Sequence, residues 1–353
     1  MTKQNATVFL GMSGGVDSSV SAILLKEQGY KVVGVYMKNW SKDLPGMKCP
    51  WAEDLADAKR VAVKLGIDFM VFDFEKEYKQ KVVDYMLGEF QAGRTPNPDI
   101  MCNEEIKFKL FFEEALKRGA DYIATGHYAK SENGKLKLAK DDNKDQTYFL
   151  YRISKEAVEK TLFPLAELKK PEVKQIAAKH NLANAYKKES MGVCFVGEVG
   201  MKDFLKEYID IKPGEIREVE TEKVVGHHEG AVFYTIGQRH GLYISGNVGE
   251  VNTGLPYYVV KKDLEKNILY VSRNLNSDLV WVDEIKLKDL VMRAEHLSRG
   301  ITCSVRLRHL GELIPAKLEG DTVIFENKIK KPAAGQSAVF YDGKICLGGG
   351  IIL

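Results

Sequence analysis

A glycine-rich segment lies between the first apolar run of the chain and its first helical pattern, and it restricts the fold more than any other feature. Thr7–Met12 (TVFLGM) has the length of a buried strand, and Asp17–Gln28 has the apolar spacing of a helix that stops at Gly29. Gly11–Ser19 (GMSGGVDSS) joins them. Glycines here allow backbone N–H groups to approach a ligand, and the helix presents its positive N-terminus. The pattern predicts a strand–turn–helix unit that binds a phosphate-containing anion.

Strands and helices then alternate through the first half of the chain. Such alternation predicts a parallel sheet with helices on both faces, as in Rossmann-like α/β domains. The further expected strands are Lys31–Met37, Asp68–Phe74 and Tyr122–Thr125, and the further expected helices are Leu55–Leu65, Phe111–Leu116 and Glu172–His180.

The second half has a different pattern, because its apolar runs are short and separated by turns. Examples are AVFYTIG, YYVVKKD, NILYVSR and LVWVDEIKL, and Asp342-Gly343 has the composition of a two-residue hairpin turn. This spacing predicts small antiparallel barrels. We expect an α/β catalytic domain over residues 1–204, a central β-rich domain over 205–275 and a C-terminal antiparallel β-barrel over 276–353.

Charge and hydropathy exclude some classes of protein. The 353 residues include 52 basic and 49 acidic side chains, a net charge of +3 that does not by itself indicate nucleic-acid binding, although a local basic face is compatible with it. No apolar run reaches the roughly 18 residues of a membrane span. The N-terminal residues lack the pattern of a secretion signal. We therefore expect a cytoplasmic protein without a membrane partner.

The five cysteines are Cys49, Cys102, Cys194, Cys303 and Cys346. An odd number without an export signal argues against a disulfide framework, and the absence of a CxxC pair argues against a structural zinc site. The ordinary expectation for each cysteine is a small buried apolar side chain.

Two of the cysteines have unusual neighbours. Cys102 follows two prolines in RTPNPDIMCNEEIK (residues 94–107), which predicts that it lies on a rigid extended or turned loop beside Asp99 and Asn103. Cys194 lies in the short apolar string SMGVCFVG, with Lys187 and Lys188 nearby in sequence. Nearby positive charge favours the reactive thiolate form of cysteine. Only tertiary folding can bring the two thiols together.

The glycine-rich segment has neither the Gly-Lys-Ser/Thr of a Walker loop nor the GxGxxG of a dinucleotide site. SGGVDSS resembles instead the loop of the PP-loop ATP pyrophosphatases (adenine nucleotide α-hydrolase-like enzymes). This resemblance implies activation of an oxygen by adenylation with release of pyrophosphate. The class contains amide-forming synthetases, lysidine synthetase and RNA thiolases, and the loop alone does not choose among them.

Further strings extend the resemblance over essentially the whole chain. They resemble the tRNA-uridine 2-sulfurtransferases, also called tRNA-specific 2-thiouridylases. One departure is Glu189, where the family usually has Asp. The matching strings are GMSGGVDSSV, TPNPDIMCNEEIKF, ATGHYA, KDQTYFLYR, VCFVGE, YTIGQRHGL, GQSAVFYDG and LGGGII.

The resemblance implies roles for individual residues. Cys102 and Cys194 would be the catalytic cysteines, with Asp99 as general acid or base. The residues that would hold ATP are Gly11, Met12, Ser13, Gly14, Gly15, Val16, Asp17 and Ser18, with Met37 and Gly126 on the adenine side. Those that would contact the target base or the tRNA are Asn97, Pro98, Asp99, His127, Lys144, Asp145, Gln146, Arg306, Arg308 and Gln336.

The implied reaction is 2-thiolation of the wobble uridine. Adenylation of the C2 oxygen makes it a good leaving group, and sulfur arrives as a persulfide on Cys194 from a donor protein. Cys102 either releases sulfide and forms a disulfide with Cys194, or attacks C2 first. Mg²⁺ would accompany the triphosphate.

Three alternatives remain open at this point. An amide-forming PP-loop synthetase would not need the cysteine pair. A non-catalytic RNA-binding module would use ATP only as a structural ligand. An iron–sulfur cluster on Cys102, Cys194 and a carboxylate is the third, and the absence of a CxxC pair argues against it.

Overall fold

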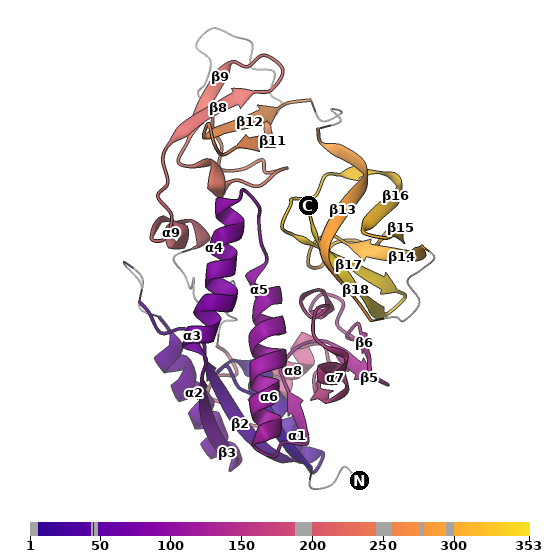
Figure 1. The fold of residues 1–353 in the computed structure, drawn as a ribbon. Coiled ribbons are helices and arrows are strands. Elements are labelled where there is room, and N and C mark those ends of the chain that lie inside the picture. The colour runs from indigo at the N-terminus through magenta and orange to yellow at the C-terminus, as the bar shows by residue number, and fades with distance from the viewer. Residues whose placement is uncertain are drawn as a thin grey trace.

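Three β-sheets organise the described part of the chain (Figure 1). The computed structural model describes residues 6–43, 45, 49–187, 200–244, 256–274, 279–293 and 300–353. The succession of a parallel sheet, a small β-rich unit and an antiparallel barrel confirms the predicted fold class. The division at residues 204 and 275 remains our proposal for the domain boundaries.

The first sheet is parallel throughout and has the order β3-β2-β1-β4-β7. Its first four strands in sequence are the four apolar runs that the sequence predicts, whereas the last strand is too short to be recognised from the sequence. The strands are β1 (Thr7–Gly11), β2 (Lys31–Lys38), β3 (Asp68–Asp73), β4 (Tyr122–Ala124) and β7 (Thr161–Leu162).

Helices cover both faces of this sheet, because alternate residues of each strand point to opposite sides. Val8 and Leu10 of β1 pack with helices α1 (Val16–Glu27), α2 (Trp51–Leu65) and α8 (Lys170–Lys179). On the other face, Phe9, Val33 and Val35 share a cluster with Phe108, Phe111 and Phe112.

Two long helical rods run on this second side of the molecule (Figure 1). Each combines α-helical turns with a π-helical stretch, over Lys79–Val83 in one and Cys102–Leu110 in the other. The α-helical parts are α3 (Glu75–Tyr78) and α4 (Asp84–Gln91) in the first, and α5 (Pro98–Met101) and α6 (Phe111–Lys117) in the second. The remaining helices are α7 (Lys155–Glu159) and α9 (Met201–Lys206).

The second sheet follows α9 and has the order β10-β9-β8-β12-β11. One expectation is wrong here, because Ala231–Phe233 of AVFYTIG forms a 3₁₀ turn rather than a strand. The strands are β8 (Gly214–Glu218), β9 (Val224–His228), β10 (Tyr243–Ile244), β11 (Tyr258–Asp263) and β12 (Ile268–Ser272).

The third sheet contains a closed six-stranded antiparallel barrel, in which β13 pairs with both β16 and β18. Gly348 allows the closure, because a Cβ on it would lie 2.1 Å from the carbonyl oxygen of Val291. The predicted hairpin is present, but its two turn residues are Gly343 and Lys344 rather than Asp342 and Gly343, because Asp342 still pairs with Ile345. The strands are β13 (Trp281–Met292), β14 (Ile301–Arg306), β15 (Ile314–Glu319), β16 (Thr322–Lys330), β17 (Ser337–Asp342) and β18 (Ile345–Ile352).

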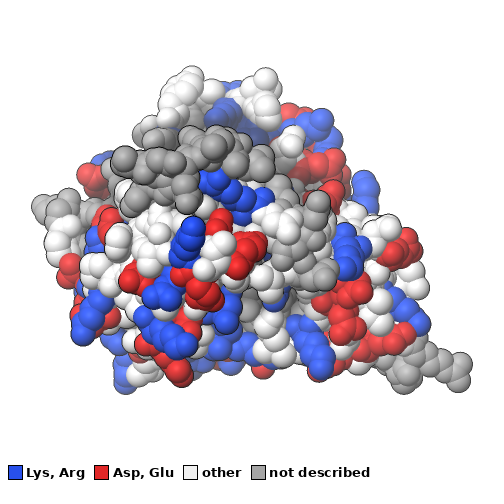
Figure 2. Space-filling model, turned by 90° about the horizontal axis from the view of Figure 1, so that it is seen from above, with Lys and Arg blue, Asp and Glu red and all other residues white. Residues whose placement is uncertain are grey.

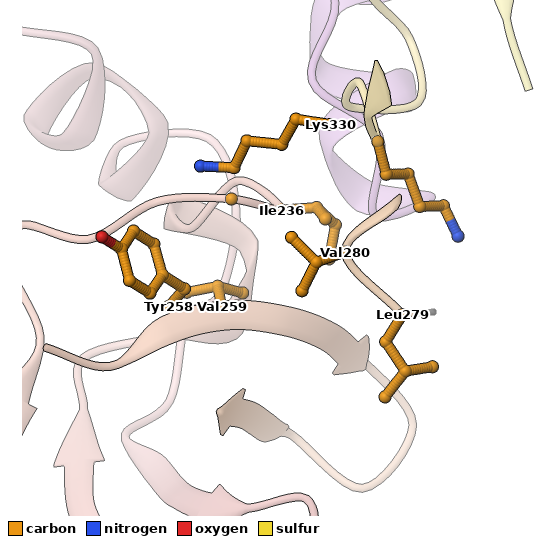
Figure 3. Close-up of a pocket in the computed structure, with 8 residues that line it drawn as sticks. Ile236, Tyr258, Val259, Leu279, Val280 and Lys330 are labelled. Atoms are coloured by element: carbon orange, nitrogen blue, oxygen red, sulfur yellow. The ribbon is translucent and has the colours of Figure 1, made fainter. Parts of the chain in front are cut away.

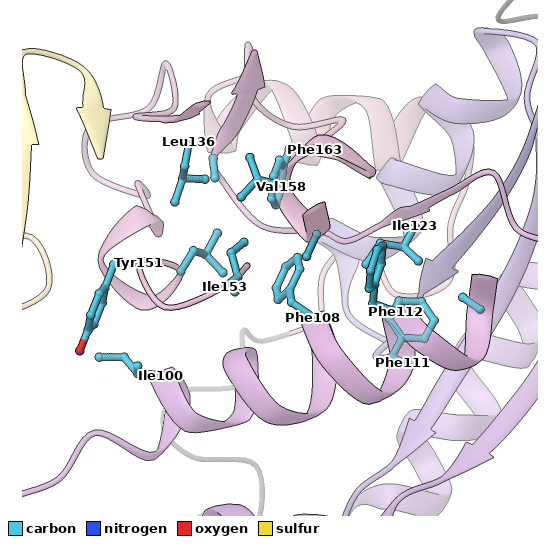
Figure 4. Close-up of a cluster of buried hydrophobic side chains, with 14 of the residues drawn as sticks. Ile100, Phe108, Phe111, Phe112, Ile123, Leu136, Tyr151, Ile153, Val158 and Phe163 are labelled. Atoms are coloured by element: carbon cyan, nitrogen blue, oxygen red, sulfur yellow. The ribbon is translucent and has the colours of Figure 1, made fainter. Parts of the chain in front are cut away.

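The barrel packs directly on the N-terminal domain. The hairpin of β5 (Lys130–Glu132) and β6 (Lys135–Lys137) extends the barrel sheet beside β18. Val339, Tyr341 and Cys346 of the barrel belong to the same buried cluster as the phenylalanines of the second helical rod. Figure 4 shows how this cluster continues from Phe111 and Phe112 to Ile100 and Tyr151. The two domains therefore share one hydrophobic core.

The central sheet also contacts the barrel. Lys330 at the end of β16 places its ammonium 4.9 Å from the centre of the Tyr258 ring (Figure 3). Ile236, Val259 and Val280 line the same contact. The cavity that remains there is about 10 Å³, which is at most the size of one water molecule. This contact is packed and offers no room for a ligand.

Candidate functional site

The glycine-rich turn lies between β1 and α1, at the carboxyl edge of the parallel sheet. Gly14 has a φ of +76°, and a Cβ on it would lie 2.4 Å from the carbonyl oxygen of Asp54, so this position requires glycine. Gly15 is the N-cap of α1 and provides no side-chain cap for the first N–H groups of the helix. Ser13 is exposed and Ser18 donates to the Gly15 carbonyl at 3.1 Å. The local geometry is that of an anion-binding helix terminus.

Asp17, in the first turn of α1, is held by two residues from elsewhere in the domain. The ammonium of Lys170, at the start of α8, lies 2.7 and 2.8 Å from the two carboxylate oxygens. The Tyr128 hydroxyl donates to the same carboxylate at 3.0 Å. The Lys170 side chain is 9% exposed and that of Asp17 is 32% exposed. A mostly buried cation is therefore built into the anion-binding turn.

The residues assigned to the adenine side lie close to this turn. A Cβ on Gly11 would come within 2.9 Å of the Met37 Cε, so Met37 packs over the end of β1. A Cβ on Gly126 would lie 2.8 Å from the backbone nitrogen of Ser18. The ends of β1, β2 and β4 thus meet at one edge, where ligands bind in open α/β sheets.

The segment around Cys102 differs from the expectation of an extended loop. Asn97 is extended, but Pro98 is the first residue of helix α5. Proline is favoured at this position because its missing N–H would have no intrahelical partner there. Asp99 and Cys102 therefore lie on successive turns of one helix.

Cys102 itself is buried, with 4% exposure, in a cluster with Trp40, Phe204 and Leu205. This agrees with the ordinary expectation of a buried apolar cysteine, and Phe204 and Leu205 of α9 belong to the cluster around Cys102. Cys194 lies outside the described residues. The proximity of the Cys102 and Cys194 sulfur atoms therefore remains a prediction. The catalytic roles of the two cysteines also remain predictions.

Burial also changes the chemistry of Asp99. Desolvation raises the pKa of its carboxyl above the ordinary value near 3.8, while Lys107 and His309 partly oppose this rise. Beside it, the Asn103 amide donates to the Phe149 carbonyl at 3.2 Å, and its own Oδ1 is buried without a partner in the structure. These are polar groups on the helix that carries Cys102.

His127 packs against Phe108, with ring centres 5.7 Å apart, and its Nδ1 lies 2.8 Å from the Thr125 hydroxyl. Burial lowers the pKa of His127 well below its ordinary value, and Lys107 lowers it further. The imidazole is therefore neutral near pH 7. Any contact of His127 with RNA would be a hydrogen bond or a ring contact rather than an ion pair.

The string KDQTYFLYR (residues 144–152) forms a large part of the contact with the barrel. Asp145 is 1% exposed, and its carboxylate lies 3.1 Å from the Arg306 guanidinium. His309 approaches the Asp145 carbonyl at 2.9 Å and lies 4.4 Å, centre to centre, from the Phe149 ring. Lys144 and Gln146 are partly exposed. For Asp145 and Arg306 these contacts support a structural role, and RNA contact remains a prediction.

Arg308 and Gln336 have contrasting surroundings. Arg308 is exposed on the barrel surface. The Gln336 amide donates to the Thr95 carbonyl of the N-terminal domain at 2.7 Å. Figure 2 shows both signs of charge interspersed over the described part of the face seen from above, in agreement with the small net charge.

Sequence reasoning did not identify Lys170, His309 or Thr95 as parts of the site. Lys170 precedes a proline at the start of a predicted helix, a pattern that indicates only a helix terminus. His309 and Thr95 have no local pattern at all, because their positions depend on contacts between domains.

The other cysteines differ from what a reactive thiol needs. Burial raises the pKa of Cys303 and of Cys346 to about 11, and it raises the pKa of Cys49 as well. A thiol with a raised pKa carries little thiolate at neutral pH. Within the described ranges, no three His, Cys, Asp or Glu side chains are grouped as a metal site requires. None of the described helices is long and apolar enough to span a membrane.

Comparison with known proteins gives matches over nearly the whole chain. Residues 6–198 match the model of the tRNA methyl transferase HUP domain, residues 202–273 that of the tRNA methyl transferase PRC-barrel domain, and residues 282–352 that of the Aminomethyltransferase beta-barrel domain. The tRNA-specific 2-thiouridylase MnmA of Bacillus subtilis (strain 168) is 45% identical over 360 residues, which cover 99% of this chain and 95% of the relative.

The protein of the same name from Pseudomonas fluorescens is 48% identical over 370 residues, covering 99% of this chain and 94% of that relative. Among solved structures, a 4-thiouridine synthetase–RNA complex with bound ATP aligns with 52% of this chain and 43% of its own, at 18% identity and a TM-score of 0.35.

Proposed function

The chain belongs to the tRNA-specific 2-thiouridylase family, and on that premise we propose that it thiolates the wobble uridine of tRNA at C2 through an adenylated base and a cysteine persulfide. One observation supports this proposal most directly. Met37 lies at the edge of the anion-binding turn, and Trp40, three residues later, packs in the cluster that contains Cys102. The segment after β2 thus links a nucleotide-binding edge to a cysteine-bearing helix.

The chemistry begins with a poor leaving group. The C2 oxygen of uridine attacks the α-phosphorus of ATP, the bond to the β-phosphate oxygen breaks, and pyrophosphate leaves. The base then carries AMP on that oxygen. The helix N-terminus and Lys170 would stabilise the negative charge of the phosphates. Mg²⁺ would offset the remaining charge when bound, and the Asp17 carboxylate offers the kind of oxygen ligand that Mg²⁺ prefers.

The cysteines complete the exchange of oxygen for sulfur. Cys194 receives a sulfur atom from a donor protein by thiol exchange and becomes a persulfide. In one route Cys102 attacks that persulfide, sulfide leaves and displaces AMP from C2, and a Cys102–Cys194 disulfide remains. In the other route Cys102 attacks C2 first and displaces AMP. The outer sulfur of the Cys194 persulfide then displaces the Cys102 thiolate from C2, and Cys102 attacks the Cys194 sulfur, which releases the thiolated base and leaves the same disulfide. In both routes AMP leaves with the original oxygen.

Access to Cys102 has an energetic cost. The wobble base must leave the anticodon stack, which costs a few kcal/mol in base-flipping enzymes. Because Cys102 is 4% exposed, side chains of its cluster must also move before the base reaches the sulfur. Asp99, one helical turn before Cys102, would then transfer protons, since a raised pKa brings a carboxyl closer to the working pH of a general acid or base.

The tRNA contacts follow from the surfaces next to this helix. Asn97 and Asp99 would contact the target base, and His127 with the partly exposed Lys144 and Gln146 would contact the neighbouring RNA. Arg308 is the exposed candidate on the barrel. These assignments are part of the proposal.

The proposal is tested by incubating the protein with tRNA, ATP and a persulfide source, followed by mass spectrometry of the digested nucleosides. We expect 2-thiouridine at the wobble position, with AMP and pyrophosphate as the nucleotide products. Asp17→Ala should abolish pyrophosphate release while tRNA binding remains. Tightly bound tRNA without pyrophosphate would indicate a non-catalytic RNA-binding module, and ADP as the tRNA-dependent product would contradict the adenylation step.

The cysteine roles are tested by comparing Cys102→Ser with Cys194→Ser. Neither variant should form 2-thiouridine, but both should still adenylate tRNA. The persulfide mass shift should persist in Cys102→Ser and disappear in Cys194→Ser. Cys303→Ser, as the matched control, should remain active because its thiol has a raised pKa and lies in the barrel core. Formation of 2-thiouridine by Cys102→Ser at a near wild-type rate would show that the two-cysteine mechanism is wrong.

A further inference from the structure

Thr95 lies immediately before residues 96–99, which lead into the helix that carries Cys102. We call residues 96–99 the target-base segment, because the proposed contacts to the target base lie there. The residue before a proline is restricted to extended conformations, and a proline in turn fixes its own φ. Pro96 and Pro98 are both buried. The position and orientation of the Thr95 backbone therefore determine where the Asn97 and Asp99 side chains lie.

All three polar groups of Thr95 contact other domains. Its N–H donates to the Ala334 carbonyl of the barrel at 2.8 Å. Its carbonyl accepts from the Gln336 amide at 2.7 Å. Its hydroxyl lies 3.2 Å from the hydroxyl of Thr235 in the central domain. We call the four residues Thr95, Thr235, Ala334 and Gln336 the Thr95 junction.

The barrel side of this junction is hydrogen-bonded and closely fitted. The Gly335 N–H donates to the Ile352 carbonyl, and the Ile352 N–H donates to the Gln336 carbonyl, each at 2.8 Å. Gly335 has a φ of +89°, and a Cβ on it would lie 2.9 Å from the Thr95 nitrogen. Only glycine allows the two backbones to approach in this way.

The barrel also contacts the ion pair of the residue before Thr95. Arg94 forms a two-pronged ion pair with the buried Glu89, with both N···O distances at 2.6 Å. Lys288 of β13 lies 3.3 Å from the same carboxylate. Arg94 is therefore held by Glu89 of its own domain, and the barrel contacts this ion pair through Lys288.

We propose that the Thr95 junction positions the target-base segment, so that Gln336 and Thr235 act as positioning residues through which both β domains set the geometry of Asn97, Asp99 and Cys102. This rests on the proposed function. It gives Gln336 a role within the protein, whereas the family resemblance implies contact with RNA. It also gives the central domain a role that RNA binding does not require.

The test uses Gln336→Ala and Thr235→Ala in the full-length protein. Thr235 lines an open cavity of about 380 Å³, so loss of its hydroxyl leaves no void in a packed core. Thr235→Ser retains the hydroxyl and should behave as the wild type. Thr302→Ala, at an exposed barrel position, is the matched control.

The first readout is hydrogen exchange of peptides that cover residues 94–107, which needs neither substrate nor activity. We expect faster exchange in Gln336→Ala and Thr235→Ala and wild-type exchange in the serine variant and the control. Unchanged exchange in both alanine variants would overturn the proposal.

The second readout is single-turnover thiolation with saturating tRNA and ATP. A misplaced segment should reduce the rate by roughly tenfold or more, since small displacements of reacting groups are costly, while the tRNA Kd should change little. If Gln336→Ala instead weakens tRNA binding and leaves exchange unchanged, Gln336 is an RNA contact and the proposal is wrong. If the wild-type protein does not thiolate tRNA, the proposed function is contradicted. Faster hydrogen exchange in the alanine variants would still support the positioning role of the Thr95 junction.

Discussion

Asp17 places a negative charge in the turn where we propose that a triphosphate binds. Alone, such a carboxylate would repel the ligand, but Lys170 contacts both of its oxygens and Tyr128 donates to one of them. A cation that is already desolvated interacts more strongly with an incoming charge than a solvated one. The ion pair with Lys170 therefore offsets the negative charge that Asp17 places in the turn.

We expect Lys170→Met to weaken ATP binding by at least about tenfold and to leave adenosine binding unchanged, because only the phosphates lose a partner. Lys170→Arg should retain part of the affinity. Lys170→Met leaves the Asp17 carboxylate without its cation, which also reduces the stability of the protein. The double variant Asp17→Asn, Lys170→Met should regain stability but not ATP affinity. Equal ATP affinity for wild type and Lys170→Met, measured by equilibrium binding, would contradict a role of Lys170 at the phosphates, whereas wild-type affinity of the double variant would show that Lys170 only neutralises Asp17.

The burial of Asp99 predicts how the stability of the protein depends on pH. Burial raises its folded-state pKa above the unfolded value near 3.8, so the stability that the protonated carboxyl contributes is complete below that value and is lost as the pH rises through the folded pKa. Asp99→Asn removes this loss. We expect Asp99→Asn to unfold at a higher temperature than the wild type at pH 8, and the difference to shrink as the pH falls toward 4.

The same variant should lose thiolation, because an amide cannot transfer the proton. Asp342→Asn, at the exposed barrel hairpin, is the control and should follow the wild-type pH dependence of unfolding. A difference between Asp99→Asn and the wild type that stays constant with pH would show that the carboxyl is not destabilised by burial.

At the scale of elements, the sequence predicted most of the parallel sheet, because its strands are continuous apolar runs and its helices end at glycines. Gly66, for example, caps α2 with a φ of +59° as its position after a helical pattern indicates. Pro98 was misread because proline both breaks helices and begins them, and only the following residues decide between the two. AVFYTIG was misread because a short apolar run gives no period to distinguish a strand from a turn.

The candidate site could be predicted only where it is local. The anion-binding turn lies within nine consecutive residues, so its composition reveals its chemistry. The burial of Cys102, by contrast, depends on Phe204 and Leu205 of α9, and Asp17 meets a lysine from α8. Partners so far apart in sequence leave no pattern in a single chain.

At the scale of the whole molecule, the barrel contacts the N-terminal domain through both apolar and polar groups. It shares a hydrophobic core with that domain, and it binds the segment 144–152 through polar contacts. Tyr148 donates to the Ser337 carbonyl at 2.9 Å, and Arg152 donates to the Asp289 carbonyl at 2.9 Å. A string that resembles an RNA-contacting element is therefore also a domain interface.

The two barrel arginines provide the last prediction, because they have opposite environments. Arg306 is paired with the buried Asp145, and removal of one partner from a buried pair costs roughly 3–5 kcal/mol. Arg306→Ala should therefore lower the unfolding temperature. Arg308→Ala should leave it unchanged, weaken tRNA binding and reduce the slope of log K against log salt by about one.

The double variant Asp145→Asn, Arg306→Met separates stability from RNA contact at Arg306. It removes both charges, so it should be more stable than Arg306→Ala, since no buried carboxylate is left without a cation. If this stabilised variant binds tRNA with the wild-type affinity and salt slope, Arg306 joins the two domains and does not contact RNA. A reduced slope in the double variant would assign Arg306 both functions, and an unchanged slope in Arg308→Ala would show that Arg308 is only a solvated side chain.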